Sequence, residues 1–193
     1  MSIVPEIPTK RLLLRDVRPK DLSSYRKNFV NYSIIRHLSN VVPWPYPKDG
    51  IEEFYYKILL PNQCKTRWSW GIIEKTNPEE LIGLIEIWKP SNPDNRGFWL
   101  AEKHWGKGYM SEAADAVTDF AFNTLNWEKL ILTNALGNER SRRIKEKAGA
   151  IRIRIEKAKF VDPDYSESEI WELTKDAWTK IRSEQAAGGD GAR

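Results

Sequence analysis

The apolar residues of the chain recur with two different spacings, and each spacing predicts one kind of element. Short runs in which apolar and polar side chains alternate, or apolar runs bounded by turn residues, predict strands. Such runs fall at residues 11–17, 67–75, 80–89, 96–102, 128–136, 150–158 and 168–176. The tetrapeptide TNPE between the second and third runs is rich in turn residues, which predicts a hairpin.

Segments whose apolar residues return every three or four positions predict helices between these strands. One helix is expected after Pro19 and Asp21, which together form a helix-start signal. A second is expected over residues 51–60, with Asp49 as its cap. A third follows the glycines near residue 107, and a basic fourth spans residues 138–149. The expected buried face of the third helix consists of Ala113, Val117, Phe120, Ala121 and Leu125.

This order of elements predicts an α+β fold, in which helices flank a mixed, mostly antiparallel central sheet to give three layers. With 193 residues, of which 40% are hydrophobic and 30% charged, the chain has the composition of one globular domain. We expect this domain to span residues 8–178, with a lead-in at residues 1–7 and a flexible tail at residues 179–193.

Composition excludes several classes of protein. The single cysteine, Cys64, rules out an intrachain disulfide framework and a cysteine-based zinc site, and we expect no metal. A net charge of +4 suits an anionic small ligand but is too weak to indicate a nucleic-acid binder. Neither an apolar run of about 18 residues nor a signal-peptide pattern is present, so we expect no membrane segment and a cytoplasmic location. The sequence leaves a monomer and a homodimer equally open.

The stretch HWGKGYMSEA, residues 104–113, places two glycines between an expected strand and an expected helix. Glycines there let backbone N–H groups point outward at the positive end of the helix dipole, where an anion can approach closely. A tight turn without a ligand is the other interpretation. The phosphate-binding patterns GxxxxGK[ST] and GxGxxG do not fit, since position 111 is serine.

A second motif, further along the chain, favours the first of these interpretations. The segment NERSRRIKEKAGA begins with Asn138, contains Ser141 and ends after Lys147 and Gly149. Together the two stretches resemble the signatures of the GNAT superfamily of N-acetyltransferases, (Q/R)xxGx(G/A) and NxxSxrvlEKxGF. The opening TKRLLLRDVRPKDL and the strand ELIGLIEI also resemble segments of the RimJ/RimL branch, the ribosomal-protein alanine and serine N-acetyltransferases.

This resemblance implies that acetyl-CoA is the acyl donor and that an amine attacks its acetyl group directly. The donor's pyrophosphate would lie against main-chain N–H groups of the glycine turn, and its pantetheine arm between the strands near residues 96–100 and 129–136. Asn138 would hold that arm, and either Lys107 or an arginine of the basic helix would meet the 3′-phosphate. The residues assigned to donor binding in this way are Trp99, Leu100, Trp105, Gly106, Lys107, Gly108, Tyr109, Met110, Asn138 and Arg143.

Two residues are candidates for proton transfer. The resemblance places Ser141 near the sulfur, where its hydroxyl could protonate the departing thiolate; the alternative is a solvent-facing helix serine. Glu86 interrupts an apolar strand, and a buried carboxylate is costly unless it is compensated. Glu86 is therefore either a base or amine anchor, or a glutamate on an exposed face. Where some GNAT enzymes carry a tyrosine acid, this chain has Lys145, and where some carry a glutamate base it has Asp94 and Asn95.

Proton removal distinguishes the possible acceptors, because only a neutral amine attacks. At pH 7 an α-amino group with a pKa near ~7.8 is about 15% neutral, whereas a lysine near ~10.4 is about 0.04% neutral. A site without a strong base therefore suits a protein or peptide N-terminus, met by the aromatic, proline-rich segment at residues 39–50. The alternatives are a small-molecule amine, such as a polyamine, an antibiotic or an amino-acid-like metabolite, and a non-catalytic acyl-CoA-binding module.

Overall fold

Strands of the first half of the chain form one sheet. The computed structural model describes residues 3–189, and its first sheet has five antiparallel strands in chain order. These strands are β1 (Ile7–Pro8), β2 (Leu12–Arg15), β3 (Arg67–Glu74), β4 (Asn77–Trp88) and β5 (Arg96–Leu100). The expected hairpin is the tight connection between β3 and β4, the pair with the most extensive register.

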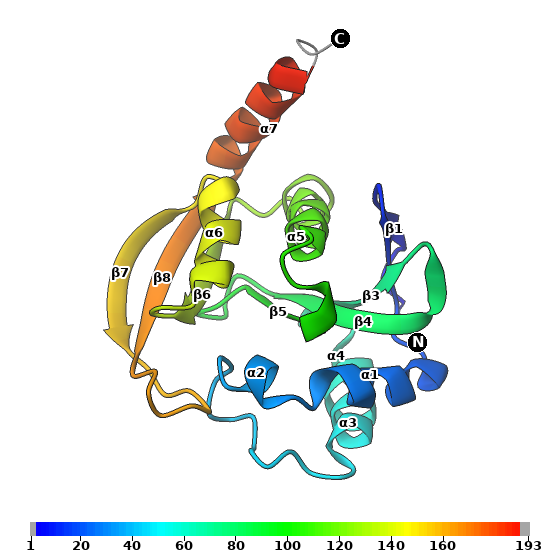
Figure 1. The fold of residues 1–193 in the computed structure, drawn as a ribbon. Helices are drawn as coiled ribbons and strands as arrows, with labels where there is room; N and C mark the ends of the chain where they lie inside the picture. The colour runs from blue at the N-terminus through cyan, green and yellow to red at the C-terminus, as the bar shows by residue number, and fades with distance from the viewer. Residues whose placement is uncertain (1–2, 190–193) are drawn as a thin grey trace.

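A second, three-stranded sheet follows in the order β6, β8, β7. Its strands, β6 (Lys129–Ala135), β7 (Ile151–Lys157) and β8 (Glu167–Thr174), are also antiparallel. In Figure 1 β5 and β6 are the neighbouring edges of the two sheets. The α+β class with a mostly antiparallel sheet and flanking helices is therefore confirmed, with the sheet divided at β5 and β6.

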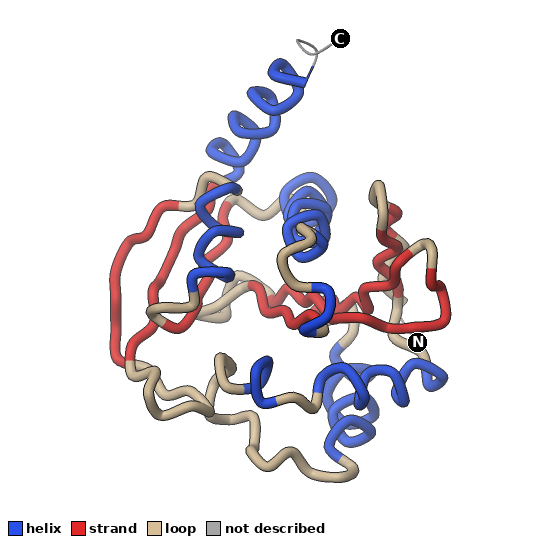
Figure 2. Tube along the Cα trace, viewed as in Figure 1, coloured by secondary structure: helices blue, strands red, loops and turns tan. Residues whose placement is uncertain are grey.

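Helices cover both faces of the first sheet (Figures 1 and 2). On one face lie α5 (Tyr109–Asp119) with its π-helical continuation η4 (Phe120–Thr124), and α6 (Glu139–Lys147) stands beside α5 in front of β6. Short helices from the first third of the chain cover the other face. They are η1 (Pro19–Asp21), α1 (Leu22–Phe29), α2 (Tyr32–Ile35), α3 (Gly50–Glu53), η2 (Phe54–Leu59) and α4 (Leu60–Asn62). A short turn, η3 (Glu102–His104), connects β5 to the glycines before α5.

Each face of the sheet has its own hydrophobic cluster. Trp70, Ile85 and Leu100 pack with Val117 of α5 on one side. Leu84 and Trp99 pack with α1, α3 and η2 on the other. This division follows from the alternation of side chains along β4 and β5, which sends successive residues to opposite faces.

Three of the five residues expected on the inner face of the helix after the glycines, Ala113, Val117 and Ala121, are buried, and the buried face shifts only near the end of the helix. Phe122 is fully buried, whereas Phe120 and Leu125 are only half-buried. The cause is η4, in which the Leu125 N–H bonds to the Phe120 carbonyl, five residues back, at 3.1 Å. A π-helical turn adds one residue per turn, so the buried face moves round the helix. The 3.6-residue period assumed from sequence was wrong beyond residue 119.

Three further expectations differ from the structure. Asp49 precedes α3 but makes no side-chain cap hydrogen bond. The expected tail is helical from the start, since α7 (Lys175–Gly189) continues directly from β8, and residues 190–193 lie outside the described part. Ile181 of α7 packs over Gly149, and Val4 of the expected lead-in belongs to the core with 1% exposure.

Candidate active site

The two sheets are tied at one point, close to the start of β5. The main-chain N–H of Asn95 donates to the carbonyl of Ile131 at 2.7 Å, and its side-chain Oδ1 accepts from the Ile131 N–H at 2.7 Å. Beside this tie, the Thr133 hydroxyl donates to the Asp94 carboxylate at 2.6 Å. Elsewhere within residues 3–189, β5 and β6 belong to separate sheets and no strand ladder joins them; we call the region between these two strands the gap.

The glycine turn lies between η3, which follows β5, and α5. Gly106 and Gly108 have φ values of 75° and 77°, a left-handed conformation that favours glycine, and Gly108 is the N-cap residue of α5. Within residues 3–189, no acceptor bonds the N–H groups of Gly106, Lys107 or Gly108. A Cβ atom on Gly106 would meet nothing within 4 Å. The turn therefore offers free donors and open space at a helix N-terminus, which fits a phosphate group.

The neighbouring N–H groups are not all available. The Trp105 N–H donates to the Glu102 carbonyl at 3.0 Å, so the free donors begin at Gly106. The Leu100 carbonyl accepts from the Trp105 indole at 2.8 Å, which gives that acceptor an internal partner. Met110 is buried in the core, so its main chain alone faces the turn.

Arg11 is a positive group at the turn that sequence reasoning missed. Its Nη1 donates to the Lys107 carbonyl at 2.8 Å, and its guanidinium lies 4.4 Å from the centre of the Tyr109 ring. Glu112, in the first turn of α5, holds Arg11 at 2.7 Å. The basic residue is distant along the chain from the glycines, and no sequence pattern connects the two, so only the fold reveals this contact.

The first turn of α6 lies next to the glycine turn. Asn138 is the N-cap residue of α6, and its side chain accepts from the Ser141 N–H at 3.2 Å. Arg140 stacks on the Trp105 ring at 3.9 Å, so the starts of the two motifs are in contact. Arg143 is exposed.

Trp99 is the one expected donor-binding residue whose side chain points to the opposite face. Its indole donates to the Tyr25 hydroxyl at 3.3 Å, on the α1 side of the sheet. Only the main chain of Trp99 therefore lies along the gap. Tyr109 also has an internal partner, because its hydroxyl bonds the Glu74 carboxylate.

Ser141 and Lys145 form a buried pair on the inner face of α6. Ser141 is 8% exposed and Lys145 2%, so the interpretation of Ser141 as a solvent-facing serine is wrong. Lys145 Nζ lies 2.8 Å from Ser141 Oγ. Burial, reinforced by the nearby Arg96 guanidinium, lowers the pKa of Lys145 to about 7, although Asp94 and Glu169 oppose the shift.

A second buried cation, Arg96, lies on the same side at the start of β5. Its Nη1 donates to the Thr118 hydroxyl of α5 at 3.0 Å, and burial lowers its pKa to about 10. Burial also raises the pKa of Asp94, against the hydrogen bond from Thr133 and the charges of Lys145 and Arg96. Charged groups of both signs thus collect beside the tie between the sheets.

Glu86 lies on the other face of β4, on the α1 side. It is 7% exposed, so the interpretation as an exposed-face glutamate is wrong. The Ser69 hydroxyl donates to its Oε1 at 2.8 Å, and Arg67 Nη1 lies 3.5 Å from the same oxygen. Burial raises the pKa of Glu86, while Arg67 and Ser69 oppose this shift. In the ladder between β4 and β5, Glu86 is paired with Gly97, so its carboxylate leaves the sheet beside a residue without a side chain.

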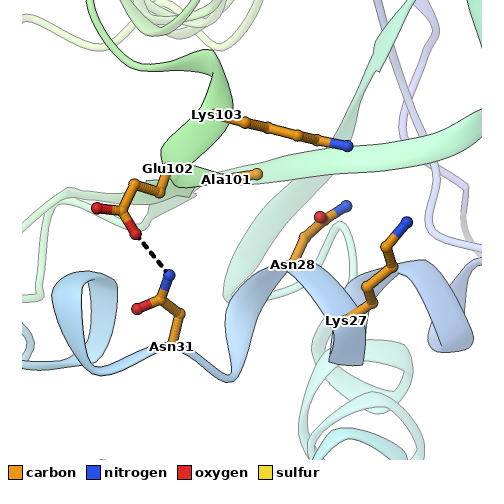
Figure 3. A pocket seen from close by; sticks show the side chains of 6 residues that line it. All are labelled: Lys27, Asn28, Asn31, Ala101, Glu102 and Lys103. Carbon is orange, nitrogen blue, oxygen red and sulfur yellow. Dashed lines mark hydrogen bonds between the residues drawn. The ribbon is translucent and has the colours of Figure 1, made fainter.

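Two open pockets lie on the α1 side of the sheet. Figure 3 shows the one of about 430 Å³ between α1 and η3, where Asn31 donates to Glu102 at 2.8 Å. The other, about 480 Å³, is bounded by η2, α4 and the loop between β4 and β5. Arg67, Trp88 and Asp94 line it, so it lies beside both the Glu86 ion pair and the tie between the sheets.

Residues 3–189 contain no group of three or more histidine, cysteine, aspartate or glutamate side chains placed to hold a metal ion. In the same part of the chain, no helix has the length and apolar character needed to cross a membrane.

Comparison with known proteins identifies the fold as that of acetyltransferases. RimL, described as a ribosomal alpha-N-protein acetyltransferase and solved with coenzyme A, superposes with a TM-score of 0.75 at 18% identity, covering 90% of this chain and 99% of RimL. Spermidine N-acetyltransferase from Vibrio cholerae gives 0.71 at 21% identity, covering 88% of this chain and 98% of that one.

Sequence comparison then gives the family. The uncharacterized N-acetyltransferase YoaA of Bacillus subtilis is 27% identical over 150 residues, or 75% of this chain and 82% of YoaA. The pattern that defines the acetyltransferase (GNAT) domain matches residues 11–151. The chain therefore belongs to the GNAT acetyltransferase family and is an acetyl-CoA-dependent N-acetyltransferase. This excludes the interpretation as a non-catalytic acyl-CoA-binding module.

Proposed function

We propose that this acetyltransferase acts on the α-amino group of a protein or peptide, as the RimJ/RimL branch does. The observation that carries the proposal is the state of Glu86. Its carboxylate is bonded by Ser69 and paired with Arg67, which oppose the rise in pKa that burial causes, so Glu86 is a carboxylate fixed in place to hold an amine. Such a group suits an amine that is partly neutral at pH 7.

The size of the effect separates the two kinds of protein amine. The neutral fraction of an α-amino group exceeds that of a lysine side chain by roughly 400-fold at pH 7, equivalent to about 3.5 kcal/mol. A lysine acetyltransferase must supply that difference with a strong base. In this proposal Glu86 orients the α-amine, or passes its proton to water, and need not be a strong base.

We assign the donor to the side of the sheet that carries α5 and α6. The free N–H groups of residues 106–108, with Arg11 and Lys107 nearby, hold the pyrophosphate. The pantetheine arm then lies in the gap between β5 and β6, along the main chain of Trp99 and Leu100 and past Asn138. The hydroxyl of Ser141 meets the sulfur, and Arg143 or Lys107 meets the 3′-phosphate.

We assign the acceptor to the opposite side, through the pocket lined by Arg67, Trp88 and Asp94. The segment at residues 39–50 lies on this side too: Tyr46 packs edge-on against Phe29, and Trp44 is 42% exposed. Exposed aromatic and proline residues on the same side of the sheet suit a peptide chain that follows the acetylated amine.

The experiment that tests this proposal compares acceptors at pH 7 by release of coenzyme A. One peptide has a free α-amine and no lysine, a second is blocked at the N-terminus and contains one lysine, and the third acceptor is spermidine. We expect kcat/KM for the first peptide to exceed that for the second at least 100-fold. Acetylation confined to lysine side chains, found by mass spectrometry, contradicts the proposal. Preference for spermidine supports the small-molecule alternative instead.

A further inference from the structure

Lys145 is buried against a single partner residue. Within residues 3–189, both hydrogen-bond acceptors of its ammonium group belong to Ser141: the hydroxyl oxygen at 2.8 Å and the carbonyl oxygen at 3.5 Å. The side chain is 2% exposed and ranks among the largest fully buried side chains of the protein. Burial of an ammonium group costs much free energy, and a hydrogen bond to a neutral hydroxyl, without a carboxylate in contact, compensates little of that cost. The structure thus holds a costly group directly behind the serine.

This contact fixes the direction of the serine proton. An ammonium group has three donors and no acceptor, so Ser141 Oγ must accept from Lys145. The hydroxyl's own hydrogen must then point away from Lys145. A neutral amine has a free lone pair and can accept that hydrogen instead. The protonation state of Lys145 therefore decides which way the Ser141 hydroxyl donates.

The surroundings of Lys145 keep both protonation states accessible near neutral pH. Arg96 on β5 repels the ammonium, whereas Asp94 before β5 and Glu169 on β8 attract it, and burial is the largest influence. Together they lower the pKa of Lys145 to about 7. Exposed lysines in the same helix, such as Lys147, lack this burial.

We propose that Lys145 is a positioning residue, which directs the Ser141 hydroxyl hydrogen toward the sulfur of the donor and returns a proton to Ser141 when coenzyme A leaves. This inference rests on the proposed place of Ser141 beside that sulfur. It adds to the proposed function the source of the proton that the departing thiolate takes up.

The amine nitrogen bonds to the acetyl carbon, the carbon–sulfur bond breaks and its electron pair stays on sulfur. Sulfur takes the hydroxyl proton of Ser141, and Ser141 takes a proton from Lys145 Nζ. The acetylated nitrogen loses one proton to Glu86 or water, and neutral Lys145 regains one from solvent. The products are the amide and the free thiol of coenzyme A.

The test measures the single-turnover rate of acetyl transfer between pH 6 and 9.5, with both substrates saturating. The parent rate should pass through a maximum and fall on the alkaline side as Lys145 loses its proton. Lys145→Met should be about 10-fold to 100-fold slower at pH 6.5 and should rise with pH to a plateau. Lys145→Arg, which cannot lose its charge, should also lack the alkaline fall. Lys147→Met removes an exposed lysine from the same helix and should match the parent.

A second readout needs no donor and no turnover. NMR of protein labelled at lysine Cε should show one signal that titrates near pH 7 and disappears in Lys145→Arg. A Lys145 signal that titrates only near ~10.4, the ordinary value of a lysine, overturns the inference. An alkaline fall that persists in Lys145→Met also overturns it, or, if that variant does not fold, one that persists in Lys145→Arg. The proposed function fails separately, by the absence of coenzyme A release from the parent with any α-amine peptide.

Discussion

Asn95 binds Ile131 from two sides, with its main-chain N–H on the Ile131 carbonyl and its side-chain oxygen on the Ile131 N–H, both at 2.7 Å. The Asn95 amide also donates to the carbonyls of Lys89 and Asn92, each at 3.1 Å. One buried side chain thus connects the last strand of one sheet to the first strand of the other. It connects the two strands that border the donor gap.

Replacement of Asn95 by alanine should weaken the connection between the two sheets. Asn95→Ala removes the side-chain acceptor of the Ile131 N–H and the amide donor to the carbonyls of Lys89 and Asn92. Loss of a buried hydrogen-bond partner costs about 1–3 kcal/mol. We expect a lower free energy of unfolding in urea and weaker binding of acetyl-CoA. Asn92→Ala, an exposed neighbour whose carbonyl remains, should change the free energy of unfolding by no more than about 0.5 kcal/mol. Equal stabilities of the two variants contradict the assigned role.

The glycine turn gives a prediction about donor binding. Valine at position 108 would have to adopt a φ of 77°, which a β-branched residue tolerates poorly, and would place a methyl-bearing carbon where the phosphate is expected. Gly108→Val should weaken acetyl-CoA binding by at least 10-fold in calorimetry. The unliganded variant should remain folded, since a Cβ there meets only the Arg11 guanidinium, at 3.4 Å. Unchanged affinity in a folded variant removes the turn from the donor site.

Ser141 gives a prediction about the chemical step. If its hydroxyl protonates the departing thiolate, Ser141→Ala should lower kcat by about 10-fold to 100-fold and raise KM for acetyl-CoA less, because the bond strengthens toward the transition state. Ser183→Ala, on the exposed surface of α7, is the matched control and should match the parent. A normal kcat with a raised KM would restrict Ser141 to donor binding.

Glu86 gives a prediction about pH. The ionised form of Glu86 binds the amine, and because burial raises the pKa of Glu86, this form is lost at a higher pH than in an ordinary glutamate as pH falls. Glu86→Gln removes the charge and should raise KM for the acceptor. The loss of activity relative to the parent should be smaller at pH 9 than at pH 7, since hydroxide and buffer then deprotonate the amine. Glu79→Gln, at the exposed start of the same strand, should have no effect. Activity of Glu86→Gln equal to the parent at both pH values excludes this residue from the mechanism.

Burial of Lys145 also predicts a pH dependence of stability. Its pKa is about 7 in the folded protein and near ~10.4 in the unfolded chain, so between these values the unfolded state binds more protons. This group therefore lowers the free energy of unfolding most below pH 7, and the loss is recovered as pH rises toward 10. Lys145→Met should have a higher free energy of unfolding than the parent at pH 6, and this difference should shrink by pH 9.5. A difference in free energy of unfolding that stays constant with pH contradicts this prediction.

Much of the fold is encoded locally and follows from the sequence alone. The alternating residues of β4 and β5, and Gly149 in left-handed conformation after α6, give their elements without reference to the rest of the chain. The glycine turn is of the same kind, because two residues without Cβ before a helix suffice to predict exposed N–H groups at its start.

What the sequence could not decide depends on partners distant along the chain. No local period reveals the π-helical turn after residue 119, in which Phe122 is fully buried. Whether Glu86 is buried depends on which helices cover its face, and Arg11 reaches Lys107 only because β2 and α5 are neighbours in space. Lys145 lies in a basic segment with the composition of a solvated helix face, and only the packing of α6 against α5 and β6 makes it a buried group. Local sequence determines a helix or strand and its ends. The burial and charge environment of a side chain depend on residues from the whole fold, and they decide the chemistry of the site.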